Sequence, residues 1–198
     1  MGEYIPFSES NLEKIANEER EKNKVLVLTG GTFDMVTDGH DYFLKSCRSN
    51  GVIYLVNSLG LENEESLDDR VSLIVNVRND ERVKAKKRPG SPVFEQERRA
   101  RGIAMLASVD YSTVHLAIEN SPTLEVAKIL RPEVLVTGDK GYGEAEKEAI
   151  RKTLGYDVVF GSVPRNEDYM STSSTFKRIN SSESNVSSKE GKGKIVYS

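Results

Sequence analysis

The feature that most constrains the fold of this chain is an apolar run that ends in two glycines. Residues 25–28 are aliphatic, and Thr29, Gly30 and Gly31 follow them. A short continuous apolar run bounded by turn residues is typical of a buried parallel strand. Residues 41–47 then show a helical pattern, which places Gly39 and His40 at or near the start of a helix. The sequence therefore predicts a strand, a tight turn and a helix in immediate succession.

This succession predicts chemistry centred on phosphate. A glycine-rich turn that leads into a helix exposes unpaired backbone N–H groups and the positive end of the helix dipole, and both favour a phosphate. The imidazole of His40 could add a hydrogen bond to a phosphoryl oxygen. The dinucleotide-binding fingerprint Gly-x-Gly-x-x-Gly is not present in this turn, so the motif does not indicate that class of site.

The rest of the chain alternates between the two kinds of element. Strands are predicted at 71–77, 111–116, 134–137 and 158–160, and helices at 95–107, 124–130 and 144–154. This alternation predicts an α/β fold, a Rossmann-like doubly wound parallel sheet with helices on both faces. Ligands bind such sheets at the carboxyl ends of the strands, which is where the turn at 30–40 lies.

The sequence divides into three parts. Residues 1–23 are predicted to form an N-terminal helical extension whose N-cap is Ser10. Residues 24–179 form the main domain, with an insertion at about 52–70 for which a short extra strand and a loop are favoured. Residues 180–198 are rich in Ser, Lys and Gly and are predicted to be disordered, because they cannot bury enough apolar surface.

Composition excludes several classes of function. The net charge is −3 and charges of both signs are interspersed, so we expect neither nucleic acid nor membrane as a partner. No apolar run is long enough to span a membrane and the N-terminus does not resemble a signal peptide, so a cytoplasmic location is expected. Cys47 is the single cysteine and is interpreted as a packed residue. No dedicated metal ligands are evident, and a homodimer is left open.

The turn resembles a known signature. Gly31-Thr32-Phe33-Asp34, followed by Thr37-x-Gly39-His40, is similar to the Gly-Thr-Phe-Asp and (His or Thr)-x-Gly-His motifs of the nucleotidyltransferase superfamily. This superfamily includes cytidylyltransferases, phosphopantetheine adenylyltransferases and heptose-phosphate adenylyltransferases. Thr37 stands where the sugar and glycerol branches usually have His and where the phosphopantetheine branch commonly has Thr.

Two further segments extend the resemblance over roughly residues 24–179. Ser171, Thr172, Ser173 and Arg178 are similar to the C-terminal motif of the superfamily, which implies contacts to the β- and γ-phosphates; a plain Ser/Thr helix cap is the alternative. The series from Asp80 through a basic stretch to Arg88-Pro89, and then Arg99, resembles the heptose-phosphate adenylyltransferases and their glycerol-phosphate and ethanolamine-phosphate cytidylyltransferase relatives. Gly138-Asp139-Lys140 matches neither the sugar nor the glycerol branch, which leaves the nucleobase open.

The resemblance implies a role for each matched residue. Nucleoside monophosphate, with AMP favoured, would pass from a nucleoside triphosphate carrying Mg²⁺ to a small phosphorylated substrate such as a sugar phosphate. The alternatives are a cytidylyltransferase acting on a phospho-alcohol such as glycerol 3-phosphate, and a catalytically weakened nucleotide-binding regulatory protein. The predicted catalytic residues are His40, Thr37 and Arg178. The predicted nucleotide-binding residues are Gly31, Thr32, Phe33, Gly39, Arg48, Gly138, Asp139, Ser171, Thr172 and Ser173, and the predicted substrate-binding residues are Asp34, Asp80, Arg88 and Arg99.

Overall fold

A computed structural model describes residues 2–62, 66–87, 89–116, 121–166 and 168–169. Its strands are β1 (Glu3–Tyr4), β2 (Val25–Gly31), β3 (Val71–Val77), β4 (Tyr111–Thr113), β5 (Val134–Gly138) and β6 (Val159–Val163). Its α-helices are α1 (Glu9–Glu21), α2 (Asp38–Leu59), α3 (Asp80–Lys86), α4 (Gln96–Ala104), α5 (Pro122–Leu130) and α6 (Glu144–Leu154), and a short 3₁₀ helix, η1, covers Leu67–Arg70.

The strands form one parallel sheet in the order β1-β4-β3-β2-β5-β6. β2 pairs with β3 on one side and with β5 on the other. The chain thus leaves β2 toward one half of the sheet and returns to the other half, and the strand order switches beside β2. The predicted Rossmann-like fold class is confirmed.

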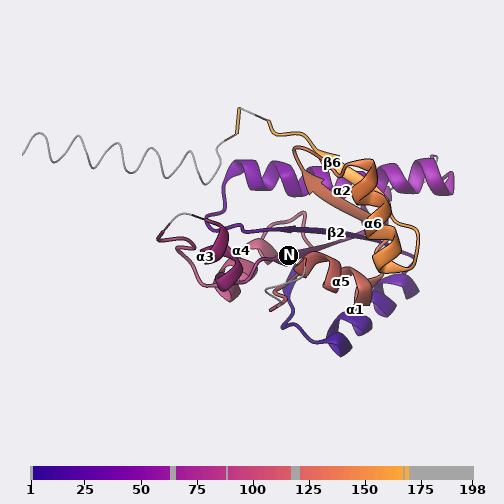
Figure 1. The fold of residues 1–198 in the computed structure, drawn as a ribbon. Coiled ribbons are helices and arrows are strands. Elements are labelled where there is room, and N and C mark those ends of the chain that lie inside the picture. The colour runs from indigo at the N-terminus through magenta and orange to yellow at the C-terminus, as the bar shows by residue number, and fades with distance from the viewer. Residues whose placement is uncertain (1, 63–65, 88, 117–120, 167, 170–198) are drawn as a thin grey trace, which may run out of the picture.

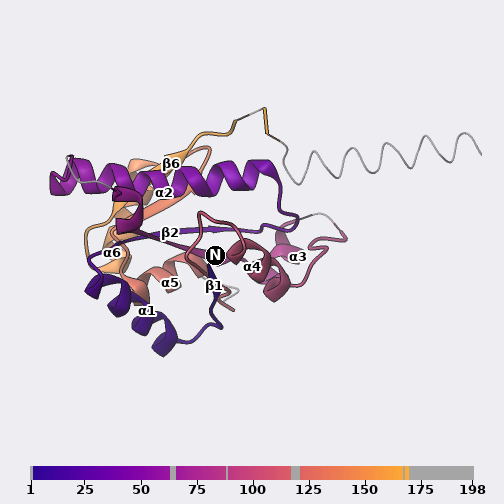
Figure 2. The same cartoon turned by 180° about the vertical axis from the view of Figure 1, so that it is seen from behind.

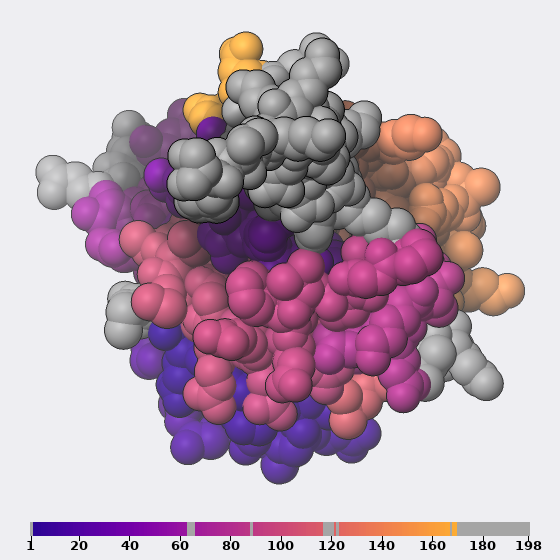
Figure 3. All heavy atoms as spheres, turned by 90° about the vertical axis from the view of Figure 1, so that its left-hand side faces the viewer, coloured from indigo at the N-terminus to yellow at the C-terminus, as the bar shows by residue number. Residues whose placement is uncertain are grey.

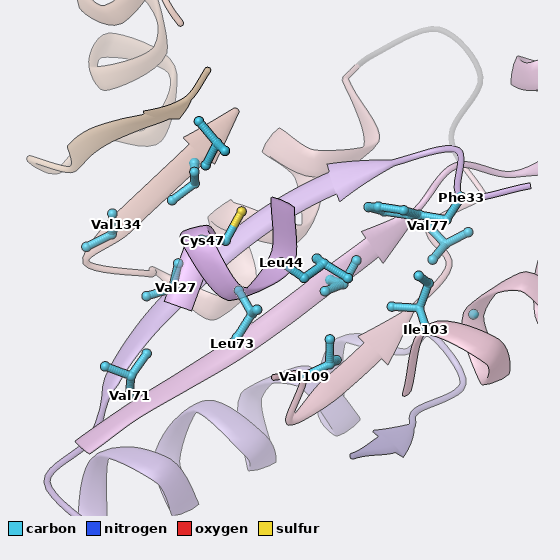
Figure 4. Close-up of a cluster of buried hydrophobic side chains, with 14 of the residues drawn as sticks. Val27, Phe33, Leu44, Cys47, Val71, Leu73, Val77, Ile103, Val109 and Val134 are labelled. Carbon is cyan, nitrogen blue, oxygen red and sulfur yellow. The ribbon is translucent and has the colours of Figure 1, made fainter. Parts of the chain in front are cut away.

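Helices cover both faces of the sheet (Figures 1 and 2). On one face, side chains of α2 and α4 pack with alternate strand residues around Val27, Leu73 and Val134, as Figure 4 shows. On the other face, α1, α5 and α6 pack on the intervening strand residues, which include Leu28 and Leu135. Strands buried on both faces explain why their sequences are continuous apolar runs.

The prediction of a strand within residues 52–59 is wrong, because α2 continues to Leu59 and ends at Gly60, whose φ is 70°. The buried residues of α2 are Leu44, Cys47, Gly51 and Leu55, spaced three or four apart, so one stripe of the helix faces the sheet. Burial there raises the pKa of the Cys47 thiol to about 12, as expected for a packed residue. The β-branched residues at 52, 53 and 56 gave this part of the helix a strand-like sequence.

The contact between α2 and the sheet is unusually close at Gly51. A Cβ atom on this glycine would lie 2.7 Å from methyl carbons of both Val27 and Val71. On β6, a Cβ atom at Gly161 would lie 2.4 Å from the side-chain oxygen of Asn50 in the same helix. These two glycines therefore set how near α2 lies to the strands.

The N-terminal segment is more closely integrated than predicted. The expected helix is present as α1, but its N-cap is Ser8 rather than Ser10, because the Ser8 hydroxyl accepts a hydrogen bond from Asn11 N at 3.1 Å. β1 precedes it and adds an edge strand beside β4. The helix α3 also covers the basic stretch that begins at Asp80, where no helix was predicted from the sequence.

A buried carboxylate fastens α1 to the sheet. Glu19 is 1% exposed. Its Oε1 accepts hydrogen bonds from Lys22 Nζ at 2.7 Å and from the Tyr111 hydroxyl at 3.0 Å, and its Oε2 forms an ion pair with Lys24 Nζ at 2.9 Å. Burial alone would raise the pKa of Glu19, but the hydrogen bonds from the two lysines outweigh it and lower the pKa to about 2.

Candidate active site

The carboxyl ends of β2, β3, β5 and β6 meet at one edge of the sheet, and Figure 3 views the molecule from this end. The turn after β2 lies there, between the segments that follow β3 and β5. Both glycines that end β2 are required by close contacts. A Cβ atom at Gly30 would lie 2.4 Å from the Thr123 hydroxyl, and one at Gly31 would lie 2.6 Å from the Phe33 ring.

The turn presents His40 on the first turn of α2. Thr37 is the N-cap of this helix, and Thr37 and His40 form a reciprocal capping box. Thr37 N donates to His40 Nδ1 at 3.1 Å. Because a backbone N–H can only donate, Nδ1 is an acceptor, and the proton of the neutral ring lies on Nε2.

The surroundings of His40 favour the neutral ring. Burial lowers the pKa of His40, and a hydrogen bond with the Met35 backbone and the charge of Asp38 offset only part of this effect. Phe33 is 4% exposed and packs edge-on against the imidazole, with 5.3 Å between ring centroids. The ring is therefore fixed by both packing and hydrogen bonding before any ligand arrives.

A cavity of about 210 Å³ opens beside His40. The first turns of α2 form one wall, and the ends of β5 and β6 form the other. Tyr42 and Tyr169 stack at its margin with 5.0 Å between ring centroids. Asp139 Oδ1 accepts from Arg165 N at 3.2 Å and joins the ends of the two strands. The residues that line the cavity are Thr37, Gly39, His40, Tyr42, Phe43, Gly138, Asp139, Val163, Pro164, Arg165, Asn166 and Tyr169.

The structure brings five predicted residues together around this cavity. Thr37, Gly39, His40, Gly138 and Asp139 all line it, although they come from segments about a hundred residues apart in the sequence. The aromatic residues of the margin were not singled out from the sequence. A signal existed for Tyr42, since it lies within the first turns of the predicted helix, but none indicated that Tyr169 would stack on it.

Asp34 does not face an open site. It is 5% exposed, and its carboxylate accepts from Val93 N at 2.8 Å and from Phe94 N at 3.1 Å. Both oxygens take part, since Val93 N also lies 3.0 Å from Oδ2. This carboxylate therefore fixes the loop at 92–94 against the turn, and direct contact of Asp34 with substrate stays a prediction.

Arg99 is also an internal residue. Its side chain is 0% exposed. Nε donates to Phe94 O at 2.9 Å, Nη1 to Thr32 O, and Nη2 to Arg78 O and to Asp80 Oδ1, both at 2.7 Å. These four hydrogen bonds join three loops, and direct contact of Arg99 with substrate stays a prediction. Asp80, 22% exposed at its side chain, is engaged in the same ion pair.

Arg48 lies at the opposite end of the sheet from the turn. α2 runs from the carboxyl ends of the strands toward their amino ends, so Arg48, eight residues after His40, reaches the start of β3. Its guanidinium donates to Asp110 at 2.6 Å, to Asp68 at 2.8 Å and to Val71 O at 2.9 Å. The prediction that it neutralises a triphosphate is corrected: Arg48 joins α2 to β3 and to the segment before β4.

Some predicted residues lie outside the part of the chain that the structure describes. These are Arg88, Ser171, Thr172, Ser173 and Arg178, together with the tail at 180–198. Among the described residues, no group of three or more His, Cys, Asp or Glu side chains could hold a metal ion, and no helix is long and apolar enough to cross a membrane.

The sequence is similar to several characterised proteins, although no protein-family model matches it. It is 30% identical over 165 residues to the FAD synthase of Thermococcus onnurineus, an alignment that covers 82% of this chain and 95% of that protein. It is 28% identical over 172 residues to the bifunctional protein HldE of Aliarcobacter butzleri, covering 87% of this chain. The chain spans only 30% of the length of that relative.

A solved structure supports the fold. The lipopolysaccharide core biosynthesis protein of Thermoplasma volcanium superposes with a TM-score of 0.55 at 22% sequence identity. The superposition covers 72% of this chain and 98% of that one. This likeness supports the fold over 72% of the chain.

Proposed function

The chain belongs to the cytidylyltransferase-like nucleotidyltransferase superfamily, and we propose that it transfers a nucleoside monophosphate, AMP in preference, from a nucleoside triphosphate to a small phosphorylated acceptor. The observation that carries the proposal is the cavity beside His40, where the capped N-terminus of α2 meets the ends of β5 and β6. A helix N-terminus stabilises negative charge, and the cavity opens directly beside the one that begins α2.

The proposed reaction is a single displacement. An oxygen of the acceptor phosphate forms a bond to the α-phosphorus, the bond from that phosphorus to the bridging oxygen of the β-phosphate breaks, and pyrophosphate leaves with the electron pair. The α-phosphate carries additional negative charge in the transition state. A preorganised N–H donor at that point lowers the barrier. We propose that Nε2–H of His40 is this donor and that it exchanges its hydrogen bond with the Met35 backbone for one to the phosphate oxygen.

Thr37 and Gly39 have supporting roles in this proposal. The Thr37 N–H bond to Nδ1 orients the imidazole so that Nε2 is the atom that can donate. Gly39 lines the cavity without a side chain and lets phosphate oxygens come near the backbone at the start of α2. Gly138 and Asp139, on the opposite wall, are proposed to contact the nucleoside.

Magnesium would enter with the nucleotide. Mg²⁺ is usually bound through substrate phosphates and one or two carboxylates rather than by an all-protein cage. Asp34 and Asp80 are already engaged by backbone N–H groups and by Arg99, which suits an ion carried mainly by the triphosphate. The motif residues Ser171, Thr172, Ser173 and Arg178 are proposed to contact the β- and γ-phosphates, as their resemblance implies.

The test is pyrophosphate release, measured with each of the four nucleoside triphosphates against a panel of phosphorylated acceptors. The panel would include hexose and heptose phosphates, glycerol 3-phosphate and flavin mononucleotide. We expect ATP to be the preferred donor. His40→Ala should lower the rate by about 10²–10³, whereas His115→Ala, which removes the only other histidine, should leave it close to the wild-type rate.

The outcomes separate the alternatives. A tenfold preference for CTP, with glycerol 3-phosphate as the acceptor, would assign the chain to the cytidylyltransferase branch. Tight nucleotide binding with no release of pyrophosphate from any acceptor would support a regulatory protein instead of an enzyme.

A further inference from the structure

Arg78 is the first residue after β3 and lies beside the turn that follows β2. Its backbone is fixed on both sides: Arg78 N donates to Gly31 O at 2.9 Å, and Arg78 O accepts from Arg99 Nη2 at 2.7 Å. The residue is exposed at the edge where parallel sheets of this kind bind ligands. Two hydrogen bonds thus hold the backbone in place, and the residue is accessible to solvent although its guanidinium is partly desolvated.

The guanidinium of Arg78 has no carboxylate partner within the described part of the chain. The nearby carboxylates have other partners, since Asp80 pairs with Arg99 at 2.7 Å and Asp34 accepts the backbone N–H groups of Val93 and Phe94. Desolvation by the surrounding protein, and then the positive charge of Arg82, lower the pKa of Arg78. Two neighbouring like charges attract an anion to this point.

We propose that Arg78 binds the phosphate of the acceptor, the group whose oxygen attacks the nucleotide. The inference rests on the proposed function, which supplies two anionic substrates. β3 lies on one side of β2 and β5 on the other, so Arg78 lies across the turn from the Gly138–Asp139 wall of the cavity beside His40. Acceptor and nucleotide would then approach from the two sides of one turn, as an in-line displacement requires.

The chemistry of the side chain suits this role. Guanidinium is always charged at neutral pH, and its planar fork can donate two parallel hydrogen bonds to one phosphate. Arg78 would therefore select acceptors that carry a phosphate at the reacting end, and it would hold the attacking oxygen near the α-phosphorus. Arg78 would thus bind the acceptor, and the nucleotide would bind in the cavity beside His40.

The experiment uses inorganic phosphate as the probe for the acceptor group. The full-length protein is first saturated with α,β-methylene-ATP, whose bridging carbon cannot be cleaved, and phosphate is then titrated by calorimetry. Arg78→Gln should raise the dissociation constant for phosphate by about 10- to 100-fold, and Arg78→Lys should raise it less because it retains the charge. Neither variant should change the affinity for the analogue.

Arg101→Gln is the matched control. This arginine also carries an exposed positive charge, but its guanidinium lies 4.7 Å from the ring centroid of Tyr4, at the β1 edge of the sheet. The control should bind phosphate as the wild type does. Thermal unfolding of all three variants would verify that each is folded.

Two results would overturn the inference. One is an unchanged phosphate affinity in folded Arg78→Gln, and the other is an equal loss of affinity in Arg101→Gln, which would indicate general electrostatic attraction rather than a site. If the analogue does not bind to the wild-type protein, the proposed function is contradicted. The same phosphate titration without the analogue then decides the role of Arg78 by itself.

Discussion

Arg99→Met is the substitution that most directly tests how this site is assembled. It keeps a long side chain at a position that is 0% exposed, but it removes donors from Phe94 O, Thr32 O, Arg78 O and the Asp80 carboxylate. Breaking a buried ion pair by removing one partner costs about 3–5 kcal/mol. The free energy of unfolding should fall by that amount.

The expected change is large enough to measure without difficulty. For a chain of this size, 1 kcal/mol corresponds to roughly 2–4 °C in the midpoint of thermal unfolding, so a decrease of about 6–20 °C is expected. Urea unfolding, followed by circular dichroism, would give the free energy independently. Turnover should also fall, because the carbonyls of Thr32 and Arg78 lose the group that joins their loops.

The neighbouring residue provides the control. Arg98 is exposed, and its guanidinium lies 5.4 Å from the ring centroid of Phe94, so Arg98→Met should cost less than about 1 kcal/mol. A wild-type melting midpoint for Arg99→Met would refute the internal role. If the KM for the acceptor rose at the same time, Arg99 would be a direct substrate ligand, as its position in the sequence motif first indicated.

Three further predictions follow from the same geometry. Thr37→Val removes the side-chain half of the capping box, so it should lower the free energy of unfolding by about 1 kcal/mol. It should also reduce kcat, because the His40 ring loses part of its support. If both values are unchanged, the cap determines neither stability nor turnover. Glu19→Gln should lower the free energy of unfolding by roughly 2–3 kcal/mol at pH 7, because the folded pKa of about 2 lies below the unfolded value. The difference from the wild type should be complete above pH 4.5 and should vanish as the pH falls toward 2. Glu18→Gln is the control: its carboxylate is half-exposed, so its free energy of unfolding should change little over this pH range. The folded pKa of His40 is lowered, so stability and turnover should be constant above pH 6.5. Both should decline below pH 6.5, because protonated Nδ1 can no longer accept the hydrogen bond from Thr37 N. A titration midpoint of His40 above 6.5, measured by NMR, would contradict this prediction.

The parts of the fold that follow from local sequence were predictable. β2, its two glycines and the start of α2 are contiguous, so periodicity and turn chemistry were enough to place them. The extent of α2 was not predictable in this way. Its β-branched residues after Gly51 favour a strand locally, and only packing of the Leu44–Leu55 stripe against the sheet stabilises the helix there.

In the candidate site too, features that follow from local sequence were predictable, and features that depend on distant partners were not. The common location of the residues of the turn and of the β5 end could be predicted, because a position at the carboxyl ends of strands is a property of the topology. The contacts of Arg48 and Arg99 could not be predicted, because their partners are distant in the sequence. Asp110, which is 62 residues from Arg48, directs that side chain to the far end of the sheet, and the carbonyls around Arg99 come from three separate loops.

The close contact of α2 with the sheet at Gly51 affects where the His40 imidazole lies, although the two residues are far apart on the helix. His40 and Gly51 are eleven residues apart on one rigid helix, which corresponds to about 16 Å along its axis. A methyl group at Gly51 would lie 2.7 Å from methyl carbons of Val27 and Val71 and would push the helix away from the sheet at that point, so α2 would tilt. A tilt of only about 4° would displace the imidazole by about 1 Å, and a misplacement of that size can cost about 10²-fold in rate. The spacing between α2 and the sheet, set where Gly51 and Gly161 have no side chain, would thus determine the position of His40 in the proposed reaction.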